Sequence, residues 1–260
     1  MSTKYPIILV HGIVMKNVKA FKAFGKIEKK LDEAGFETFC ADTDGLGAIE
    51  TNAEQLKSYI LGVCERTGCE KVNLIAHSKG GLDSKYMITN LGMESKVASL
   101  TTLCTPHRGS LFASGIWALP RPIKAFIAFW LNLFYKIVAR DKHPDALRAC
   151  DQLRWVDEDI ATHDFSDKVY CQSFSTTMRK GRDCFVLAIP MRLVRRFDSR
   201  ESDGLVCHES AKFGVYRGEC VRDMSLSHSQ IIDFLANKNQ KEKVYDFYIN
   251  LCRELEDMGF

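Results

Sequence analysis

One serine lies where an apolar run, a short turn and a helical pattern follow one another. Residues 71–81 read KVNLIAHSKGG, and Ser78 stands in the turn. A tight turn at this point lifts a serine Oγ clear of a sheet and aims the next backbone N–H into the same space. Ala76 stands where glycine is commonest, but alanine is the next smallest side chain. The pattern predicts a nucleophilic serine, and an ordinary strand-to-helix turn is the alternative interpretation.

A second motif near the start of the chain could supply hydrogen-bond donors for an oxyanion. The segment YPIILVHGI (5–13) is an apolar strand followed by His-Gly. A loop in this position places a backbone N–H beside the one that follows the nucleophile. We therefore expect the N–H groups of Ile13 and Lys79 to be the two donors, and we interpret His11 as structural.

A serine nucleophile needs a general base and an acid, which in this arrangement follow the serine in the order acid, then histidine. The turn SDGLV (202–206) offers Asp203, and the segment SLSHSQIIDF (225–234) offers His228. His208 lies too close to Asp203 in the chain to reach Ser78, so we interpret it as a surface-loop residue. Neither Asp198 nor Glu201 stands in the turn, and Asp203 is therefore the expected partner of His228.

The elements that must position these residues alternate between apolar β-type runs and helical patterns. This alternation predicts an α/β fold, with a mostly parallel central sheet and helices on both faces, in a single domain over residues 1–260. The runs that predict strands are 6–10, 36–41, 71–76, 97–104 and 169–174, while 186–191 fits a strand, a helix or a loop equally.

Helical periodicity marks the segments between the strands. Val18, Phe21, Phe24, Ile27 and Leu31 outline a first helix that ends near Gly35. Thr51 and Glu54, at capping-box spacing, predict the start of a second helix. A third begins just after Ser78, and residues 240–257 predict a closing helix.

Together these motifs resemble the bacterial triacylglycerol lipases of the Pseudomonas and Proteus type. The shared segments are HGI (11–13), AHSKGG (76–81), TPHRGS (105–110), SDGLV (202–206) and the late His228, and the likeness covers residues 4–110 and about 198–233. The resemblance implies the α/β-hydrolase fold and a serine carboxylic ester hydrolase, a lipase or esterase acting on acylglycerols or other acyl esters. It places the nucleophile, acid and base on Ser78, Asp203 and His228, and the oxyanion donors on Ile13 and Lys79.

Two other classes of function fit the same motifs. A thioesterase, a phospholipase or an acyltransferase would use the same triad, and a non-catalytic lipid-binding module could be built on the same fold. The intact serine, acid and histidine argue against the last of these.

An apolar, aromatic stretch (111–138) interrupts the α/β pattern, and the family inserts a cap at this point. We expect a helical lid or cap at about 111–165 whose aromatic side chains bind the substrate, and a buried core helix is the alternative. The 16 residues from Ile123 to Val138 include two lysines and an asparagine, which is too short and too charged for a membrane span. The expected substrate-binding residues are Trp117, Phe126, Phe129 and Trp130.

In the resembled lipases a structural calcium ties the loop of the catalytic histidine to an upstream acid. Asp183 falls at the upstream position, but Gln230 stands two residues after His228, where a carboxylate is normal. Calcium affinity depends on the charge of its oxygen ligands. Asp233 could compensate and keep a weak site, but Gln230 leaves one carboxylate where two are expected, so we favour a loop without calcium and expect no other cofactor.

Charge and cysteine content limit the partners. Thirty-six basic against 33 acidic residues, without a long basic run, argue against nucleic acid. The expected partner is a small-molecule or lipid ester, with transient contact at a lipid interface, and the oligomeric state is left open. Ten cysteines without paired spacing, and no apolar leader before residue 5, predict reduced thiols and a cytoplasmic location, with non-classical export left open.

Overall fold

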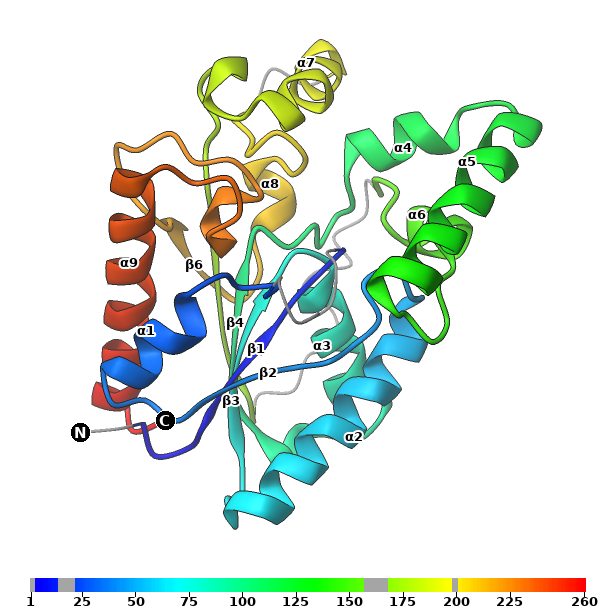
Figure 1. The fold of residues 1–260 in the computed structure, drawn as a ribbon. Coiled ribbons are helices and arrows are strands. Elements are labelled where there is room, and N and C mark those ends of the chain that lie inside the picture. Colours follow the sequence, from blue (N-terminus) through cyan, green and yellow to red (C-terminus); the bar gives the residue numbers. More distant parts are fainter. Residues whose placement is uncertain (1–2, 14–21, 157–167, 198–200) are drawn as a thin grey trace.

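Six strands form one parallel sheet in the computed structural model, which describes residues 3–13, 22–156, 168–197 and 201–260 (Figure 1). Their order across the sheet is β2-β1-β3-β4-β5-β6, and every neighbouring pair is parallel. The predicted α/β fold is confirmed. The strands are β1 (Ile7–Val10), β2 (Thr38–Cys40), β3 (Val72–His77), β4 (Val97–Leu103), β5 (Tyr170–Ser175) and β6 (Val215–Glu219).

Helices cover both faces of this sheet (Figure 1). Helices α1 (Ile27–Glu33) and α9 (Lys238–Asp257) pack on one face, where their side chains share a core with Ile7 and Leu9. Helices α2 (Ile49–Thr67) and α3 (Lys79–Asn90) pack on the other face, against Ile8 and Val10. Because successive side chains of a strand point to opposite faces, β1, which is covered on both, is apolar at all four of its positions.

A group of helices between β4 and β5 stands beside the carboxyl ends of the strands (Figure 1), and we call it the cap. Leu46, in the loop before α2, binds it through two hydrogen bonds: its N–H donates to Asp141 Oδ2 (2.8 Å) and its carbonyl accepts from the N–H of Asp145 (2.9 Å). The cap comprises α4 (Leu111–Trp117), α5 (Arg121–Phe134), a π-helical continuation (Tyr135–Ala139) and α6 (Ala146–Gln152).

Most of the remaining short elements lie in loops at the carboxyl ends of the strands, whereas the turn Glu94–Lys96 directly precedes β4. Among them α7 and α8 lie between β5 and β6, and a 3₁₀ turn follows His228. Their bounds are α7 (Ala188–Phe197), α8 (His208–Ala211), and the 3₁₀ turns Glu94–Lys96, Gly181–Asp183, Phe185–Leu187 and Gln230–Ile232.

The cap exposes a long apolar helix. Residues Arg121–Ala139 form 19 continuous helical residues. The most apolar 18-residue stretch of this helix has a mean hydropathy of 1.3, and 11% of the stretch is buried. By length and composition this helix is able to cross a membrane. The expectation that this stretch is too short to span a membrane is therefore corrected: the helix begins two residues before Ile123, at Arg121, and ends one residue after Val138, at Ala139.

The structure corrects several local predictions. The capping box at Thr51 and Glu54 is wrong, because α2 already begins at Ile49, where Gln152 of the cap accepts the first N–H. Segment 186–191, for which the sequence left strand, helix and loop open, is helical. The edge strand β6 was not predicted, because its sequence, VYRGE, is largely polar and forms no apolar run. Val18 and Phe21 lie outside the described residues.

Candidate active site

Ser78 lies in the turn between β3 and α3 with a backbone φ of 54° and ψ of −132°. A positive φ in a residue with a Cβ is strained and persists only where the surroundings hold it. Two neighbours hold this turn. The N–H of Ser78 donates to the carbonyl of Leu103 in β4 (3.0 Å), and Gly80 packs so tightly on β1 that a Cβ there would lie 2.5 Å from the His11 oxygen.

His228 connects Ser78 to Asp203. Its Nε2 lies 2.8 Å from Ser78 Oγ, and its Nδ1 lies 2.7 Å from Asp203 Oδ2. An ionised carboxylate only accepts, so Nδ1 carries the proton and Nε2 is the acceptor for the serine hydroxyl. The structure thus brings together three residues separated by 125 and 25 positions, as the sequence predicts.

Asp203 is fixed by its own loop. Its Oδ1 accepts from the N–H groups of Leu205 (2.9 Å) and Val206 (2.8 Å), and its carbonyl accepts from the N–H of His228 (2.9 Å). Its side chain is buried. The carboxylate therefore has one oxygen committed to backbone donors and the other to the imidazole, which sets the position of the ring.

The loop after β1 passes directly over the serine turn. A Cβ on Gly12 would lie 2.7 Å from the Ser78 Cβ and 2.9 Å from the Lys79 nitrogen. Only glycine permits this approach. It places Ile13, the next residue, beside the turn, and Ile13 lines the same cavity as Ser78 and His228. This is the arrangement in which two backbone N–H groups converge on one oxygen.

His77 is a functional neighbour that the sequence analysis did not single out. Its Nε2 donates to the carbonyl of His228 (2.9 Å), and the two rings lie 4.6 Å apart. Burial, together with the His228 ring, holds the pKa of His77 well below its ordinary value, so this ring is neutral. His77 therefore holds the backbone of His228 in place through this hydrogen bond, and its neutral ring does not compete for the protons of His228.

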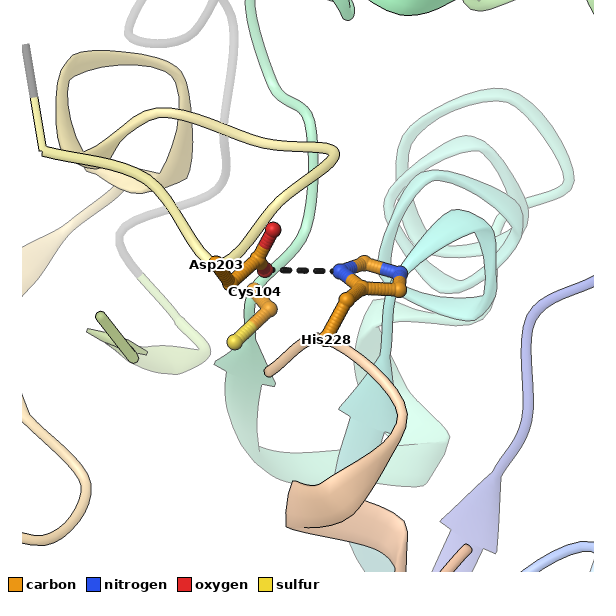
Figure 2. Close-up of side chains that lie close together, drawn as sticks. All are labelled: Cys104, Asp203 and His228. Carbon is orange, nitrogen blue, oxygen red and sulfur yellow. Dashed lines mark hydrogen bonds and ion pairs between the residues drawn. The ribbon is translucent and has the colours of Figure 1, made fainter. Parts of the chain in front are cut away.

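Cys104 lies next to Asp203 and His228 (Figure 2). Its thiol, Asp203 and His228 have ligand-type atoms within 4.8 Å of one another. The thiol instead lies 3.3 Å from Thr176 Oγ1, and burial, together with neighbouring groups that include Cys220 and Asp203, raises its pKa well above the ordinary value. A protonated thiol is a poor metal ligand, and Asp203 and His228 are already bonded to each other. We therefore interpret this cluster as part of the serine site.

Two cavities meet at Ile13 and Tyr135. The first has a volume of about 290 Å³ and contains Ser78 and His228 together with apolar side chains of the surrounding loops. The second, of about 240 Å³, lies among the cap helices. Ile13 and Tyr135 line both. An apolar chamber thus adjoins the serine site.

The four aromatic residues expected to bind substrate lie in two places. Trp117 lines the cap cavity, with Lys124 Nζ 4.0 Å from its ring centroid. Phe126, Phe129 and Trp130 are not among the residues lining either cavity; their exposed fractions are 66%, 61% and 53%. Their placement differs from the expectation because α5 packs on the rest of the cap through the side that carries Lys124, Ala128 and Asn132, which leaves the aromatic side exposed.

His208 is not a surface-loop residue. It begins α8 as a half-buried side chain whose Nε2 lies 2.9 Å from Thr177 Oγ1, and Glu219 is 3.9 Å away. Glu201, an alternative acid, is exposed and faces His208 at 3.9 Å rather than His228. Asp198 lies outside the described residues.

Side-chain amides join the segments that calcium joins in the resembled lipases. Gln230 Nε2 donates to the carbonyl of Asp183 (2.8 Å), and Gln230 Oε1 accepts from the N–H of Ser227 (2.9 Å). The Asp183 carboxylate accepts from Ser225 Oγ (2.6 Å). Asp233 bonds elsewhere, to Tyr245 and Lys241. Each carboxylate has a partner, and a neutral amide lies at the centre.

Comparison with known proteins identifies the family. The model of the alpha/beta hydrolase fold matches residues 5–143, and the chain belongs to this family. In sequence it resembles bacterial triacylglycerol lipases. It is 34% identical over 154 residues to a triacylglycerol lipase of Pseudarthrobacter phenanthrenivorans, a match of 55% of this chain and 48% of the relative. It is 26% identical to a triacylglycerol lipase of Pseudomonas fragi, over 100% of this chain and 98% of the relative.

The fold is also shared with solved esterase structures. A metagenomic carboxyl esterase superposes with a TM-score of 0.76 at 15% identity, covering 98% of this chain and 76% of the other. The chain spans about half the length of the first curated relatives that it matches, 48% and 42%.

Because Gln230 holds the His228 loop through neutral hydrogen bonds, we expect calcium to be dispensable. Treatment with EGTA should leave both the rate of ester hydrolysis and the melting temperature unchanged. The measurement compares chelated protein with protein in excess calcium. A loss of either property that calcium alone restores would contradict the prediction.

Proposed function

We propose that this chain is a carboxylic ester hydrolase of the lipase or esterase type, with Ser78 as nucleophile and His228 as general base. The observation that carries the proposal is the continuous hydrogen-bonded series from Ser78 Oγ through His228 to Asp203, built on a strained turn at the end of a central strand. The names of its relatives, triacylglycerol lipase and carboxyl esterase, agree with this chemistry.

In the proposed reaction Ser78 Oγ attacks the ester carbonyl carbon while its proton moves to His228 Nε2. Asp203 keeps Nδ1 protonated and stabilises the positive imidazolium that results. The tetrahedral intermediate collapses as His228 returns the proton to the leaving alcohol, and an acyl-serine is left. Water then attacks the acyl group by the same route in reverse and releases the acid.

The negative oxygen of each intermediate would lie between the N–H groups of Ile13 and Lys79. The contact of Gly12 with the serine turn supports this placement, since it brings the Ile13 loop against the Lys79 nitrogen. Removing one such donor typically costs on the order of 3 kcal/mol in the barrier.

The cap cavity supports an acyl ester as substrate. Its lining is apolar apart from Lys124, Cys150 and the hydroxyl of Tyr135, and it opens toward Ser78 past Ile13. An acyl chain bound there gains about 0.8 kcal/mol for each buried methylene. A thioesterase, a phospholipase or an acyltransferase would use the same catalytic residues, whereas a non-catalytic lipid-binding module has no need of an aligned Ser78, His228 and Asp203.

The outer surface of α5 supports contact with a lipid interface. Phe126, Phe129 and Trp130 form a cluster of edge-to-face aromatic contacts that is exposed to solvent. Residues 111–140 contain four basic and no acidic side chains. Exposed apolar surface of this extent marks an interaction site, and adjacent lysine and arginine favour anionic headgroups. The proposed partner of this surface is a membrane or lipid droplet that holds the ester.

The Ser78→Ala variant should lose hydrolysis of p-nitrophenyl butyrate by several orders of magnitude while it stays folded, because the nucleophile is gone. A fluorophosphonate probe should label the wild-type chain at Ser78. Full activity in the folded Ser78→Ala variant would disprove the proposal.

The Asp203→Asn variant should keep the fold and lose most of the rate of hydrolysis, because the imidazole of His228 takes the wrong tautomer. Glu201→Gln, on the same loop, is the matched control and should keep full activity.

The Ala128→Phe variant should shorten the preferred acyl chain, since Ala128 lines the cap cavity and a phenyl ring would fill it. We expect kcat/KM for p-nitrophenyl decanoate to fall at least tenfold while the value for the acetate changes little, because each excluded methylene costs about 0.8 kcal/mol. Phe126→Ala, on the outer side of the same helix, is the control. Equal losses for both esters would show that the cavity does not bind the chain.

The Phe129→Ser/Trp130→Ser variant should bind vesicles of anionic phospholipid more weakly than the wild type, by about tenfold in partition coefficient, because two exposed aromatic rings are lost. Sedimentation of sucrose-loaded vesicles measures this. Hydrolysis of water-soluble acetate esters should not change. Loss of that soluble activity instead would place these residues in the substrate site.

A further inference from the structure

A buried ion pair lies directly next to the nucleophile. Lys79 Nζ donates to both carboxylate oxygens of Asp83, at 2.7 and 3.0 Å, and both side chains are fully buried. Asp83 lies one helical turn after Lys79 in α3, so the lysine side chain lies along its own helix. Lys79 is also the residue whose backbone N–H faces the oxyanion in the proposed function.

The position is an unfavourable one for a lysine. Burial penalises the charged form of the side chain, and the first turn of a helix is the positive end of its dipole. Burial also raises the pKa of Asp83 to about 6, although the charge of Lys79 opposes this shift. A buried pair of this kind is weak evidence for a contribution to stability, since apolar side chains of similar size often serve as well.

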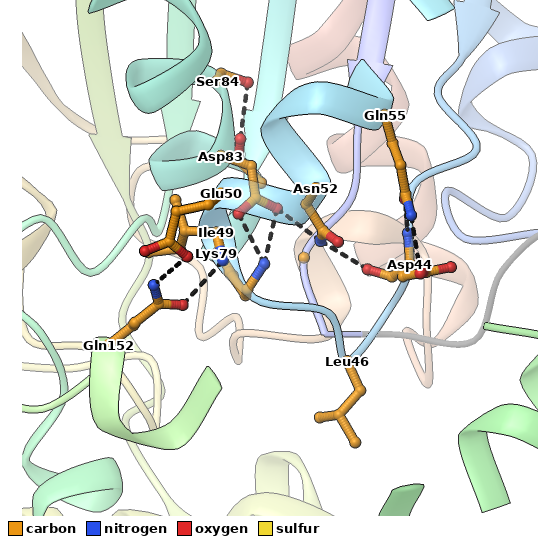
Figure 3. A network of polar contacts seen from close by, with 12 residues as sticks. Asp44, Leu46, Ile49, Glu50, Asn52, Gln55, Lys79, Asp83, Ser84 and Gln152 are labelled. Atoms are coloured by element: carbon orange, nitrogen blue, oxygen red, sulfur yellow. Dashed lines mark hydrogen bonds and ion pairs between the residues drawn. The ribbon is translucent and has the colours of Figure 1, made fainter. Parts of the chain in front are cut away.

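The pair is connected to the base of the cap (Figure 3). Asn52 in α2 donates through Nδ2 to Asp83 Oδ2 (3.0 Å) and to the carbonyl of Asp44 (2.7 Å). The Asp44 carboxylate in turn accepts the backbone N–H groups of Lys142 and His143, each at 2.8 Å. A continuous series of hydrogen bonds thus runs from the serine turn to the segment that follows the long apolar helix.

We propose that Lys79 and Asp83 are positioning residues, whose ion pair fixes the peptide that carries the Lys79 N–H oxyanion donor. This inference rests on the proposed function. The strained backbone of Ser78 leaves the orientation of the next peptide to its surroundings, and that peptide is held from two sides. Gly12 packs against its nitrogen, and the Lys79 side chain is tied to Asp83 below it. The link through Asn52 and Asp44 holds the base of the cap in the same frame.

The test is a double variant, Lys79→Met/Asp83→Asn, whose side chains are close in size to the originals. It removes both charges, and the asparagine oxygen can still accept from Asn52. The backbone N–H of residue 79 is retained. We expect a melting temperature within a few degrees of the wild type, a kcat at least tenfold lower and a KM within about twofold, because the oxyanion forms only after substrate has bound. The inhibition constant of an alkylboronic acid, which binds as a tetrahedral adduct, should rise by the same factor.

The control is Lys29→Met/Glu33→Gln, an exposed pair with the same i, i+4 spacing in α1, and it should change neither kcat nor the inhibition constant. Asp83→Glu provides a second measurement if the double variant fails to fold. It keeps both charges but moves the carboxylate. We expect kcat to fall while the melting temperature stays within a few degrees of the wild type.

A wild-type kcat in the folded double variant, or in Asp83→Glu, would overturn the positioning role. That result would leave the proposed function intact. A wild-type chain that neither hydrolyses p-nitrophenyl esters nor reacts with a fluorophosphonate would instead contradict the proposed function, so the two failures are distinguishable.

Discussion

The close approach of three backbone segments around Ser78 is the constraint on which the site depends. The serine turn, the loop after β1 and the start of α3 meet at Gly12 and Gly80, where any Cβ would lie within 3 Å of neighbouring backbone or side-chain atoms. Because the segments touch there, a positive φ at Ser78 is held, the serine Oγ stands clear of the sheet, and Ile13 is placed beside it. A larger residue at either glycine would separate the pieces of the site.

Distant loops then attach to this centre through few bonds. The backbone N–H of His228 donates to Asp203, its carbonyl accepts from His77, and its ring bonds both Asp203 and Ser78. Four contacts fix one residue, so its ring has little rotational freedom. Preorganisation of this kind lowers the barrier because no group must move when the proton is transferred.

The cap contributes a surface and a cavity rather than reacting groups. On α5 the inner side chains, including Ala128 and Leu131, enclose apolar space next to Ile13, while the aromatic rings of Phe129 and Trp130 are exposed. One helix therefore has two apolar faces with two uses in the proposed function: the inner face for an acyl chain and the outer face for a lipid surface. The Asp44 and Asn52 contacts join its base to the serine turn.

From the sequence by itself came the α/β pattern and the position of Ser78, because a strand, a tight turn and a helix start are local patterns that neighbouring residues specify. The motif order and the family resemblance also predicted that Asp203 and His228 accompany Ser78, and the structure places the three side chains together. Tertiary structure decided what depends on distant partners. Helix α2 begins at Ile49, before the predicted start at Thr51, because Gln152 of the cap accepts a hydrogen bond from the N–H of Ile49. The outward orientation of Phe126 was decided by packing, because α5 turns the side that carries Lys124 and Asn132 toward the rest of the cap and leaves its aromatic side exposed. The pairing of buried Lys79 with Asp83 was also hidden, because a lysine at the start of a helix ordinarily faces water, and only the contact of α3 with α2 and the sheet buries it.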